Sequence, residues 1–269
     1  IVSPSGASKT MKWLLIDGNN WFARDWFARN TGSLGTFLRR TETLREQFSF
    51  DRVIVAWDSP RSFRKDLSDT YKTHRGGKPD GFEQSLTACK ESVAAAAGID
   101  SIEVAGFEGD DVLATLVATA LDEGVQAVIG SADKDLHQLL ATGHVSQITN
   151  FSRASYSELR CTYMTAEFLL EKYGARPWQW VDYRTITGDQ SDGIAGPKGL
   201  GEKAAAIVMA KCGTLEKFYA SPFTAQGLSD RQRRLLLDWR PNVQLARDLL
   251  TLRRDVPLPD SFFARLQSC

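Results

Sequence analysis

The front half of the chain alternates short apolar runs with amphipathic stretches, and each apolar run is followed by an acidic residue. Strands are predicted at 13–16, 53–57, 101–105 and 126–130, and helices at 34–48, at about 82–97 and from about 110. Connections of this length favour a mostly parallel sheet with helices on both faces. In such a sheet the carboxyl ends of the strands meet at one edge, and ligands bind there.

The acidic residues are concentrated at these strand ends and after a later glycine. They are Asp17, Asp58, Glu108, Asp110, Asp111, Asp133, Asp135, Asp189 and Asp192. So many carboxylates in one crevice would repel one another and raise one another's pKa unless cations are bound there. Oxygen ligands without His or Cys select hard ions, so the pattern predicts Mg²⁺ or Mn²⁺. Two such ions about 4 Å apart activate water and stabilise the leaving oxygen in phosphodiester hydrolysis.

Taken singly, these acids have a simpler interpretation. An Asp after a strand is usually a turn residue or a helix N-cap, and the Gly-Asn-Asn segment at 18–20 fits a plain turn. Asp110 and Asp111, at a helix start, would stabilise the helix dipole. The cap interpretation has to be invoked separately for each strand, whereas bound metal ions account for all the acids together.

Composition narrows the class of protein further. The 269 residues suffice for a well-covered core, include 33 basic and 33 acidic residues and contain no apolar run long enough to span a membrane. Basic residues are nevertheless concentrated at 61–78 and 198–254, where local fields can hold nucleic acid. A cytoplasmic protein with reduced thiols is indicated by four scattered cysteines without a CxxC pair, Cys89, Cys161, Cys212 and Cys269.

Beyond Thr165, a residue suited to a helix N-cap, the pattern becomes helical. Helices are predicted at 166–173, 178–187, 201–212, 231–239 and 242–253. The glycine-rich segment 188–201 interrupts them. The back part of the chain is therefore expected to be a helical region.

Four short motifs together resemble the 5′–3′ exonuclease family, which includes the N-terminal exonuclease domain of bacterial DNA polymerase I, phage 5′ exonucleases and flap endonucleases. The motifs lie in order at 14–20, 108–111, 133–135 and 188–193. Each motif alone is weakly specific, but the ordered set is highly specific and extends from about residue 11 to 257. The resemblance implies that Asp17, Asp58, Glu108 and Asp110 lie nearest one metal ion. It places a second ion near Asp111, Asp133, Asp135, Asp189 and Asp192.

The segment Tyr71-Lys-Thr-His-Arg75 resembles the family's Tyr-Lys-x-Asn-Arg motif in a helical arch over the active site, with His74 in place of the usual Asn. The resemblance implies that Tyr71, Lys72 and Arg75 contact DNA, and that Lys72 and Arg75 stabilise charge on the scissile phosphate. Without the resemblance, a solvated basic loop is the favoured interpretation of this stretch.

The glycine-rich segment 193–201 resembles the hairpin of a helix–hairpin–helix element. Gly196, Gly199 and Gly201 would let backbone N–H groups approach a DNA phosphate, with counter-charge from Lys198 and Lys203. Family members also bind K⁺ through hairpin carbonyls, which correspond here to Ile186, Thr187, Ala195, Pro197 and Leu200. Ala195 stands where proline is common, and a plain turn between helices remains the alternative.

These observations define one expectation and two alternatives. The expected protein has a flexible leader (1–10), an α/β nuclease core (11–163) with an arch at about 59–98, and a helical region (164–269) with the helix–hairpin–helix at about 186–212. It is expected to be a monomeric two-metal nuclease that cuts DNA at or near 5′ ends or flaps next to downstream duplex. The alternatives are a PIN-type ribonuclease and a DNA-binding protein with a degenerate metal site.

Overall fold

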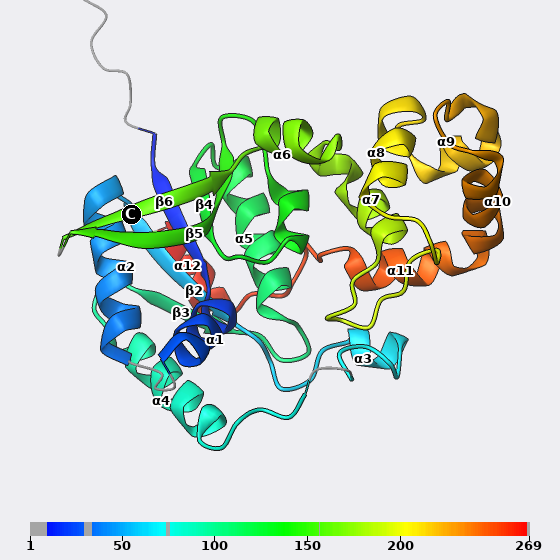
Figure 1. The fold of residues 1–269 in the computed structure, drawn as a ribbon. Helices are drawn as coiled ribbons and strands as arrows, with labels where there is room; N and C mark the ends of the chain where they lie inside the picture. Colours follow the sequence, from blue (N-terminus) through cyan, green and yellow to red (C-terminus); the bar gives the residue numbers. More distant parts are fainter. Residues whose placement is uncertain (1–9, 30–33, 74–75, 156, 268–269) are drawn as a thin grey trace, which may run out of the picture.

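The computed structural model describes residues 10–29, 34–73, 76–155 and 157–267, and a six-stranded sheet of order β3-β2-β1-β4-β5-β6 lies at its centre (Figure 1). The strands are β1 (Lys12–Asp17), β2 (Arg52–Trp57), β3 (Asp100–Glu103), β4 (Gln126–Gly130), β5 (Val145–Ser155) and β6 (Glu158–Met164). Strands β1 to β5 are parallel, and β6 pairs antiparallel with β5. The prediction of a mostly parallel sheet is confirmed.

Helices surround this sheet and form the back part of the chain. They are α1 (Gly18–Arg29), α2 (Leu34–Phe48), α3 (Arg64–Leu67), α4 (Phe82–Ala95), α5 (Gly109–Asp122), α6 (Ala166–Tyr173), α7 (Trp180–Thr187), α8 (Glu202–Lys211), α9 (Leu215–Ala220), α10 (Asp230–Trp239), α11 (Val243–Leu250) and α12 (Asp260–Gln267). The stretch expected to form the arch, at about 59–98, contains the short α3 and the whole of α4.

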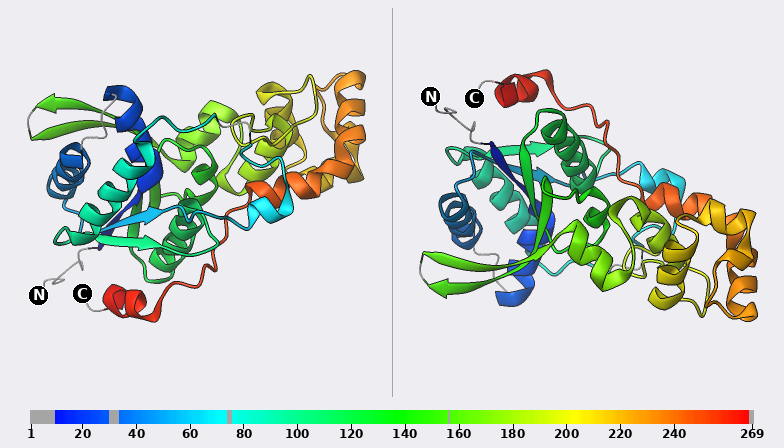
Figure 2. Two further views of the ribbon diagram at one scale, coloured as in Figure 1. Left: turned by 90° about the horizontal axis from the view of Figure 1, so that it is seen from below. Right: turned by 90° about the horizontal axis from the view of Figure 1, so that it is seen from above.

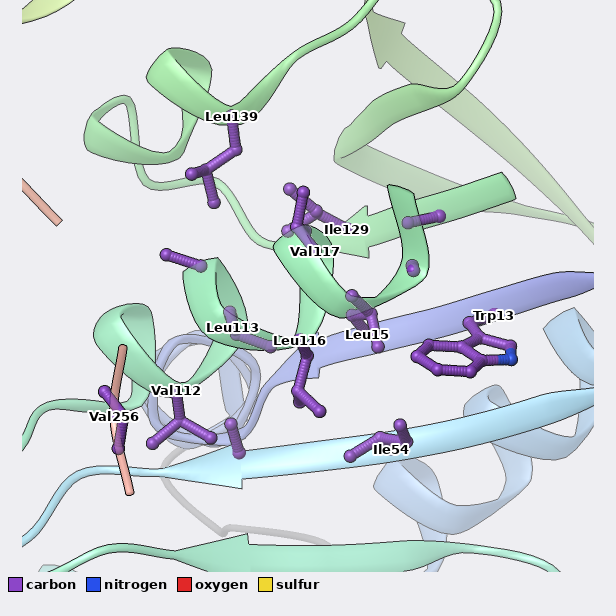
Figure 3. Close-up of a cluster of buried hydrophobic side chains, with 14 of the residues drawn as sticks. Trp13, Leu15, Ile54, Val112, Leu113, Leu116, Val117, Ile129, Leu139 and Val256 are labelled. Carbon is purple, nitrogen blue, oxygen red and sulfur yellow. The ribbon is translucent and has the colours of Figure 1, made fainter. Parts of the chain in front are cut away.

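Alternate residues of the central strands face opposite sides of the sheet, and different helices cover each side. On one side Trp13, Leu15 and Ile54 pack against α5 (Figure 3). On the other side Leu14 and Ile16 pack against α1, α2 and α4. Helices therefore lie on both faces, as the alternation of the sequence predicts.

Helices α6 to α11 form a second body with its own core around Trp180, Tyr183 and Phe218. This helical region extends to one side of the sheet, and the chain then returns so that α12 lies at the opposite end of the molecule (Figure 2). Residues 251–258 make that return, and Leu252 and Val256 join the core beneath α5. The helical region is thus connected to α12 by a segment that contributes Leu252, Val256 and Leu258 to the sheet's own core.

Several predicted helices are observed with the expected bounds or close to them. Helices α2 and α6 agree at both ends, and the Thr165 side chain accepts a hydrogen bond from the Phe168 N–H at 3.2 Å as an N-cap. The helix predicted at 242–253 is wrong at its end, because α11 stops at Leu250 where the returning segment begins.

The sequence does not predict α1, β5, β6, α9 or α12. Most residues of β5 beyond Ile148 are polar and partly or fully exposed, so the strand lacks the apolar run that marks the central strands. Strand β5 is long because β6 pairs with it as a hairpin, and no local sequence pattern predicts that pairing.

Two further features concern the cysteines and the helices of the described residues. Cys89, Cys161 and Cys212 are free thiols, whereas Cys269 lies outside the described residues. No described helix combines the length and apolar character that crossing a bilayer requires.

Candidate active site

Carboxylates from three neighbouring strands meet at the carboxyl edge of the sheet. Asp17 ends β1, Asp58 directly follows β2, and Asp133 follows β4. The strands are in register there, since Asp17 pairs with Ala56 of β2 and Ile16 pairs with Gly130 of β4. The parallel sheet therefore brings together acids that are far apart in the sequence.

Asp17 is buried and held by two donors. Its carboxylate accepts hydrogen bonds from the Asn20 N–H at 2.9 Å and from the Ser131 hydroxyl at 2.8 Å. Gly18 lets the chain turn directly into α1, because a Cβ there would lie 2.4 Å from the Trp57 ring. The Gly-Asn-Asn segment is thus the start of a helix that fixes the orientation of Asp17.

Asp58 is connected to both neighbouring elements. Its carboxylate accepts from the Gly109 N–H at 2.8 Å, and its own N–H donates to the Asn19 side chain at 3.0 Å. These contacts tie the end of β2 to the first turns of α1 and α5.

Glu108 and Asp111 form a capping box at the start of α5, as the cap interpretation requires. Asp111 is fully buried, and its two carboxylate oxygens lie 2.6 and 2.8 Å from the guanidinium of Arg64. Arg64 also lies 3.2 Å from Glu108. The sequence did not single out Arg64, since nothing local distinguishes it from the other basic residues of 61–78.

Tyr71 and Lys72 lie over the carboxylates. The Tyr71 hydroxyl donates to Glu108 at 2.9 Å, and the Lys72 ammonium group lies 2.7 Å from the same carboxylate. Tyr71 is buried against Ile194 and Leu249. These two residues therefore do not belong to a solvated loop, whereas Arg75, predicted to act with Lys72, lies outside the described residues, as does His74.

A second group of acids gathers between the sheet and the helical region. One oxygen from each of Asp135, Asp189 and Asp192 lies within 4.8 Å of the others, and no other trio of Asp, Glu, His or Cys residues in the described ranges is so close. The guanidinium of Arg184 donates to Asp135 at 3.0 Å and also pairs with Asp189. Arg184, which the sequence did not single out, thus supplies positive charge to this group.

The crowding of carboxylates changes their proton affinity. Burial, together with the charge of Asp58, raises the pKa of Asp17 to about 7. Burial and the neighbouring Asp133 raise the pKa of Asp135 to about 7 as well. Burial, followed by the charges of Asp17, Asp133 and Asp58, raises the pKa of Asp110.

Asp133 and Asp189 differ in the sign of the shift. Burial raises the pKa of Asp133. Burial also opposes the ionisation of Asp189, but the hydrogen bond from Ser191 and the charge of Arg184 outweigh it, and the pKa is lowered. The raised pKa values of Asp17, Asp110, Asp133 and Asp135 mean that these carboxyl groups oppose one another's ionisation. A bound cation would relieve this repulsion, so the environment favours cation binding.

The glycine-rich hairpin packs tightly against the end of α7. A Cβ on Gly196 would lie 2.5 Å from the Ile186 carbonyl oxygen and 2.9 Å from the Gly188 nitrogen. Asp189 and Ile194 exchange two backbone hydrogen bonds of 2.7 Å, so the turn between them is short and closed. Gly199 has a positive φ of 89° and Gly201 is the N-cap of α8. Both have open space where a Cβ would be.

A parallel sheet with carboxylates at its carboxyl edge, a basic connection over them and an attached helical region together form the candidate site. The chain belongs to the 5′-3′ exonuclease family. The family's N-terminal resolvase-like domain matches residues 12–174, and its C-terminal SAM fold matches residues 175–267. The predicted family membership and fold are confirmed.

Individual relatives agree with this assignment. DNA polymerase I of Deinococcus radiodurans is 35% identical over 96% of this chain, which spans 27% of that protein's length. The T5 5′-exonuclease with bound zinc has the same fold, with a TM-score of 0.75, 19% identity and 89% of both chains covered. A bacteriophage T5 flap endonuclease complex with DNA and metal ions gives a TM-score of 0.73 at 19% identity, covering 89% of this chain and 88% of that one.

Proposed function

We propose that the chain is a structure-specific 5′ nuclease that hydrolyses phosphodiesters at or near the 5′ ends or flaps of DNA. The observation that carries the proposal is the crowding of buried and half-buried acids with raised pKa values at the carboxyl edge of the sheet, next to Lys72. The family membership supports the same reaction. The substrate would be DNA with a 5′ end or flap and downstream duplex, bound by a monomer.

The residues at the sheet edge fit divalent metal ions. Their donor atoms are carboxylate oxygens without His or Cys, which suits Mg²⁺ or Mn²⁺. Bound ions would lower the mutual repulsion of the acids and supply water activation and charge neutralisation at the phosphate. Nine residues would hold two ions, directly, through water or, for Asp111, by fixing a neighbouring ligand: Asp17, Asp58, Glu108, Asp110, Asp111, Asp133, Asp135, Asp189 and Asp192.

Asp111 would act differently from the other acids. Its carboxylate is occupied by Arg64 and also accepts the Arg253 N–H at 2.9 Å. Its contribution would be to hold Glu108 in place through the capping box and through the shared Arg64. The other acids would offer oxygens to the ions, Glu108 by giving up part of its contact with Lys72.

Lys72 and Tyr71 would contact the reacting strand. Lys72 would exchange part of its interaction with Glu108 for the scissile phosphate and stabilise the charge that develops there. Tyr71, fixed by its hydrogen bond to Glu108, would keep Lys72 over the carboxylates. We propose Arg75 as a second cation for the same phosphate.

The hairpin would bind the duplex downstream of the cut. The backbone near Gly196, Gly199 and Gly201 and the side chains of Lys198 and Lys203 would meet phosphates without reading bases. A K⁺ ion bound by the carbonyls of Ile186, Thr187, Ala195, Pro197 and Leu200 would tie this loop to a phosphate. The close approach of Gly196 to the Ile186 carbonyl supports a compact loop of this kind.

A metal titration on two labelled substrates tests the proposal. Cleavage of a 5′-flap DNA should vanish with chelator, return with Mg²⁺ or Mn²⁺ and release products with a 5′-phosphate. Preferential cleavage of single-stranded RNA would favour the PIN-type ribonuclease. Tight flap binding without cleavage at any metal concentration would favour the degenerate DNA-binding protein, and full cleavage in excess chelator would exclude the two-metal mechanism.

A further inference from the structure

The segment from Ser131 to Asp135 carries two of the acids. The buried side chain of Gln147 holds the main chain of this segment. Gln147 of β5 is fully buried, and its amide nitrogen donates to the carbonyl oxygens of Ser131 at 2.8 Å and Asp133 at 2.7 Å. Both N–H bonds of the amide are therefore used on the main chain of this segment.

The opposite end of the Gln147 amide is also fixed. Its oxygen lies 2.8 Å from Nδ1 of His137. Since the amide nitrogen faces two carbonyl oxygens, the oxygen must face His137, and Nδ1 of His137 is the donor. His137 is itself buried beside Trp180, with ring centroids 5.1 Å apart. The Gln147 amide thus has one possible orientation.

Short hydrogen-bonded connections link the main chain of residues 131–135 to the carboxylates of Asp133 and Asp135. Gln147 binds the carbonyl of Asp133 itself, and the Asp133 carboxylate accepts the Asp135 N–H at 2.8 Å. The next carbonyl, of Lys134, accepts from the Trp180 indole at 2.6 Å. A displacement of the Gln147 amide would therefore move both Asp133 and Asp135.

We propose that Gln147 is a positioning residue for the nuclease reaction, which sets the placement of the Asp133 and Asp135 carboxylates for divalent ions by fixing the carbonyls of Ser131 and Asp133. Gln147 touches neither DNA nor the reacting atoms. The inference rests on the proposed function, because it assigns Asp133 and Asp135 to metal binding. Partners of this kind, one shell behind the ligands, typically change metal affinity or activity by roughly 10–100-fold.

The chain offers a matched control in Gln179. This residue is also buried, and its amide nitrogen donates to two carbonyls, those of Met209 and Gly213, each at 2.9 Å. Its oxygen accepts the Arg176 N–H at 2.9 Å. Gln179 thus holds two carbonyls at the end of α8, as Gln147 holds two carbonyls of the acidic segment. Neither Met209 nor Gly213 is next in the chain to a residue proposed to bind a metal ion.

The experiment compares Gln147→Met with Gln179→Met, using Mn²⁺ alone as the probe. Electron paramagnetic resonance measures Mn²⁺ binding without DNA, urea unfolding measures stability, and single-turnover cleavage of a flap measures activity. We expect both variants to lose stability. Only Gln147→Met should bind Mn²⁺ about tenfold or more weakly and cut correspondingly more slowly.

Each other outcome is decisive. Wild-type Mn²⁺ affinity in a folded Gln147→Met protein would overturn the inference and leave the proposed function standing. Absence of Mn²⁺ binding by the wild type would overturn the proposed function and the inference with it. Should Gln147→Met not fold, Gln147→Asn and Gln179→Asn make the same comparison, because an amide one methylene shorter cannot reach both carbonyls.

Discussion

Nζ of Lys72 lies 2.7 Å from Oε1 of Glu108, so the connection between β2 and α4 places a positive charge directly among the carboxylates of the site. The backbone at Lys72 has a positive φ of 59°, and its N–H donates to the Asp192 carbonyl at 2.9 Å. A non-glycine residue rarely adopts such a conformation unless its surroundings impose it. The surroundings here are Glu108 and the backbone of Asp192, so contacts within the candidate site impose the conformation of Lys72.

Replacing Lys72 by Ala should slow the chemical step. The loss of a charge that stabilises the reacting phosphate is expected to lower the single-turnover rate by on the order of 10²-fold or more. Lys65→Ala, at an exposed lysine of α3, should cut at close to the wild-type rate. A change confined to the dissociation constant of Lys72→Ala would make Lys72 a docking contact instead.

Replacing Asp110 by Ala should abolish cleavage and leave DNA binding nearly intact. Phosphate contacts come mainly from basic side chains and backbone N–H groups, and removal of one acid also reduces repulsion of the DNA. Filter binding in Ca²⁺ and single-turnover cleavage in Mg²⁺ measure the two effects. Asp122→Ala, at the exposed end of the same helix, is the control. Wild-type cleavage by Asp110→Ala would remove Asp110 from the site.

The raised pKa values of Asp17 and Asp135 predict how stability depends on pH. Both are about 7 in the folded chain, against 3.8 as the ordinary value, so the folded state binds protons that the unfolded state releases. Without metal, stability from these groups is present below about pH 4 and is lost as the pH rises through 7. Divalent ions bind the ionised acids, so they should restore stability most at high pH.

Thermal unfolding in chelator and in Mg²⁺ at several values between pH 5.5 and pH 8 checks this prediction. The increase in Tm caused by Mg²⁺ should be larger at pH 8 than at pH 5.5. It should shrink in Asp135→Asn, which removes one of the two titrating carboxyls. An increase that is equal at both ends of the pH range would contradict the assignment of these acids as ion ligands.

Arg64 should matter far more for stability than another arginine of the same stretch. Arg64→Ala would leave the fully buried Asp111 without its counter-charge, which typically costs about 3–5 kcal/mol. Arg61 pairs with Asp66 at the surface, with both side chains more than half exposed, so Arg61→Ala should change stability very little. Urea unfolding measures the stability of both variants. Equal losses of stability would show that the ion pair of Arg64 with Asp111 is not required for the fold.

The strands and their acids could be predicted because both signals are local. An apolar run such as 13–16 is buried on both faces, and the acid that follows it must lie at the edge of a parallel sheet. The order of the strands was not predictable, since pairing is decided by contacts between distant segments. The same holds for β5 and β6, whose exposed residues carry little hydrophobic signal.

The residues that support the acids could not be found from the sequence. Arg64 contacts Asp111 47 positions away, and Arg184 contacts Asp135 49 positions away. Gln147 contacts carbonyls 14 and 16 positions away, and all these contacts exist only in the folded chain. Neither their residue types nor their spacing differs from those of ordinary solvated residues. By contrast, the acids themselves share one local context, the end of a strand, and that repetition made them visible.

The last prediction concerns the hairpin and separates two of its glycines. A Cβ on either Gly199 or Gly201 would meet open space, but Gly199 has a φ of 89°, whereas Gly201 has an extended backbone that any residue adopts. Gly199→Val should therefore change the course of the loop, at a cost of roughly 1–2 kcal/mol for the strained conformation. Gly201→Ala should leave the course of the loop unchanged and alter binding far less.

Binding of flap DNA to Gly199→Val should be weaker than wild type at every base sequence, because backbone contacts to phosphates carry no base identity. The wild-type affinity should fall steeply with salt, and the variant should show a shallower slope if it neutralises fewer phosphates. Fluorescence anisotropy in Ca²⁺ over a salt series measures both quantities, and Mn²⁺ binding by the variant should stay normal. A folded Gly199→Val protein with wild-type affinity and salt slope would show that this segment is only a turn between α7 and α8.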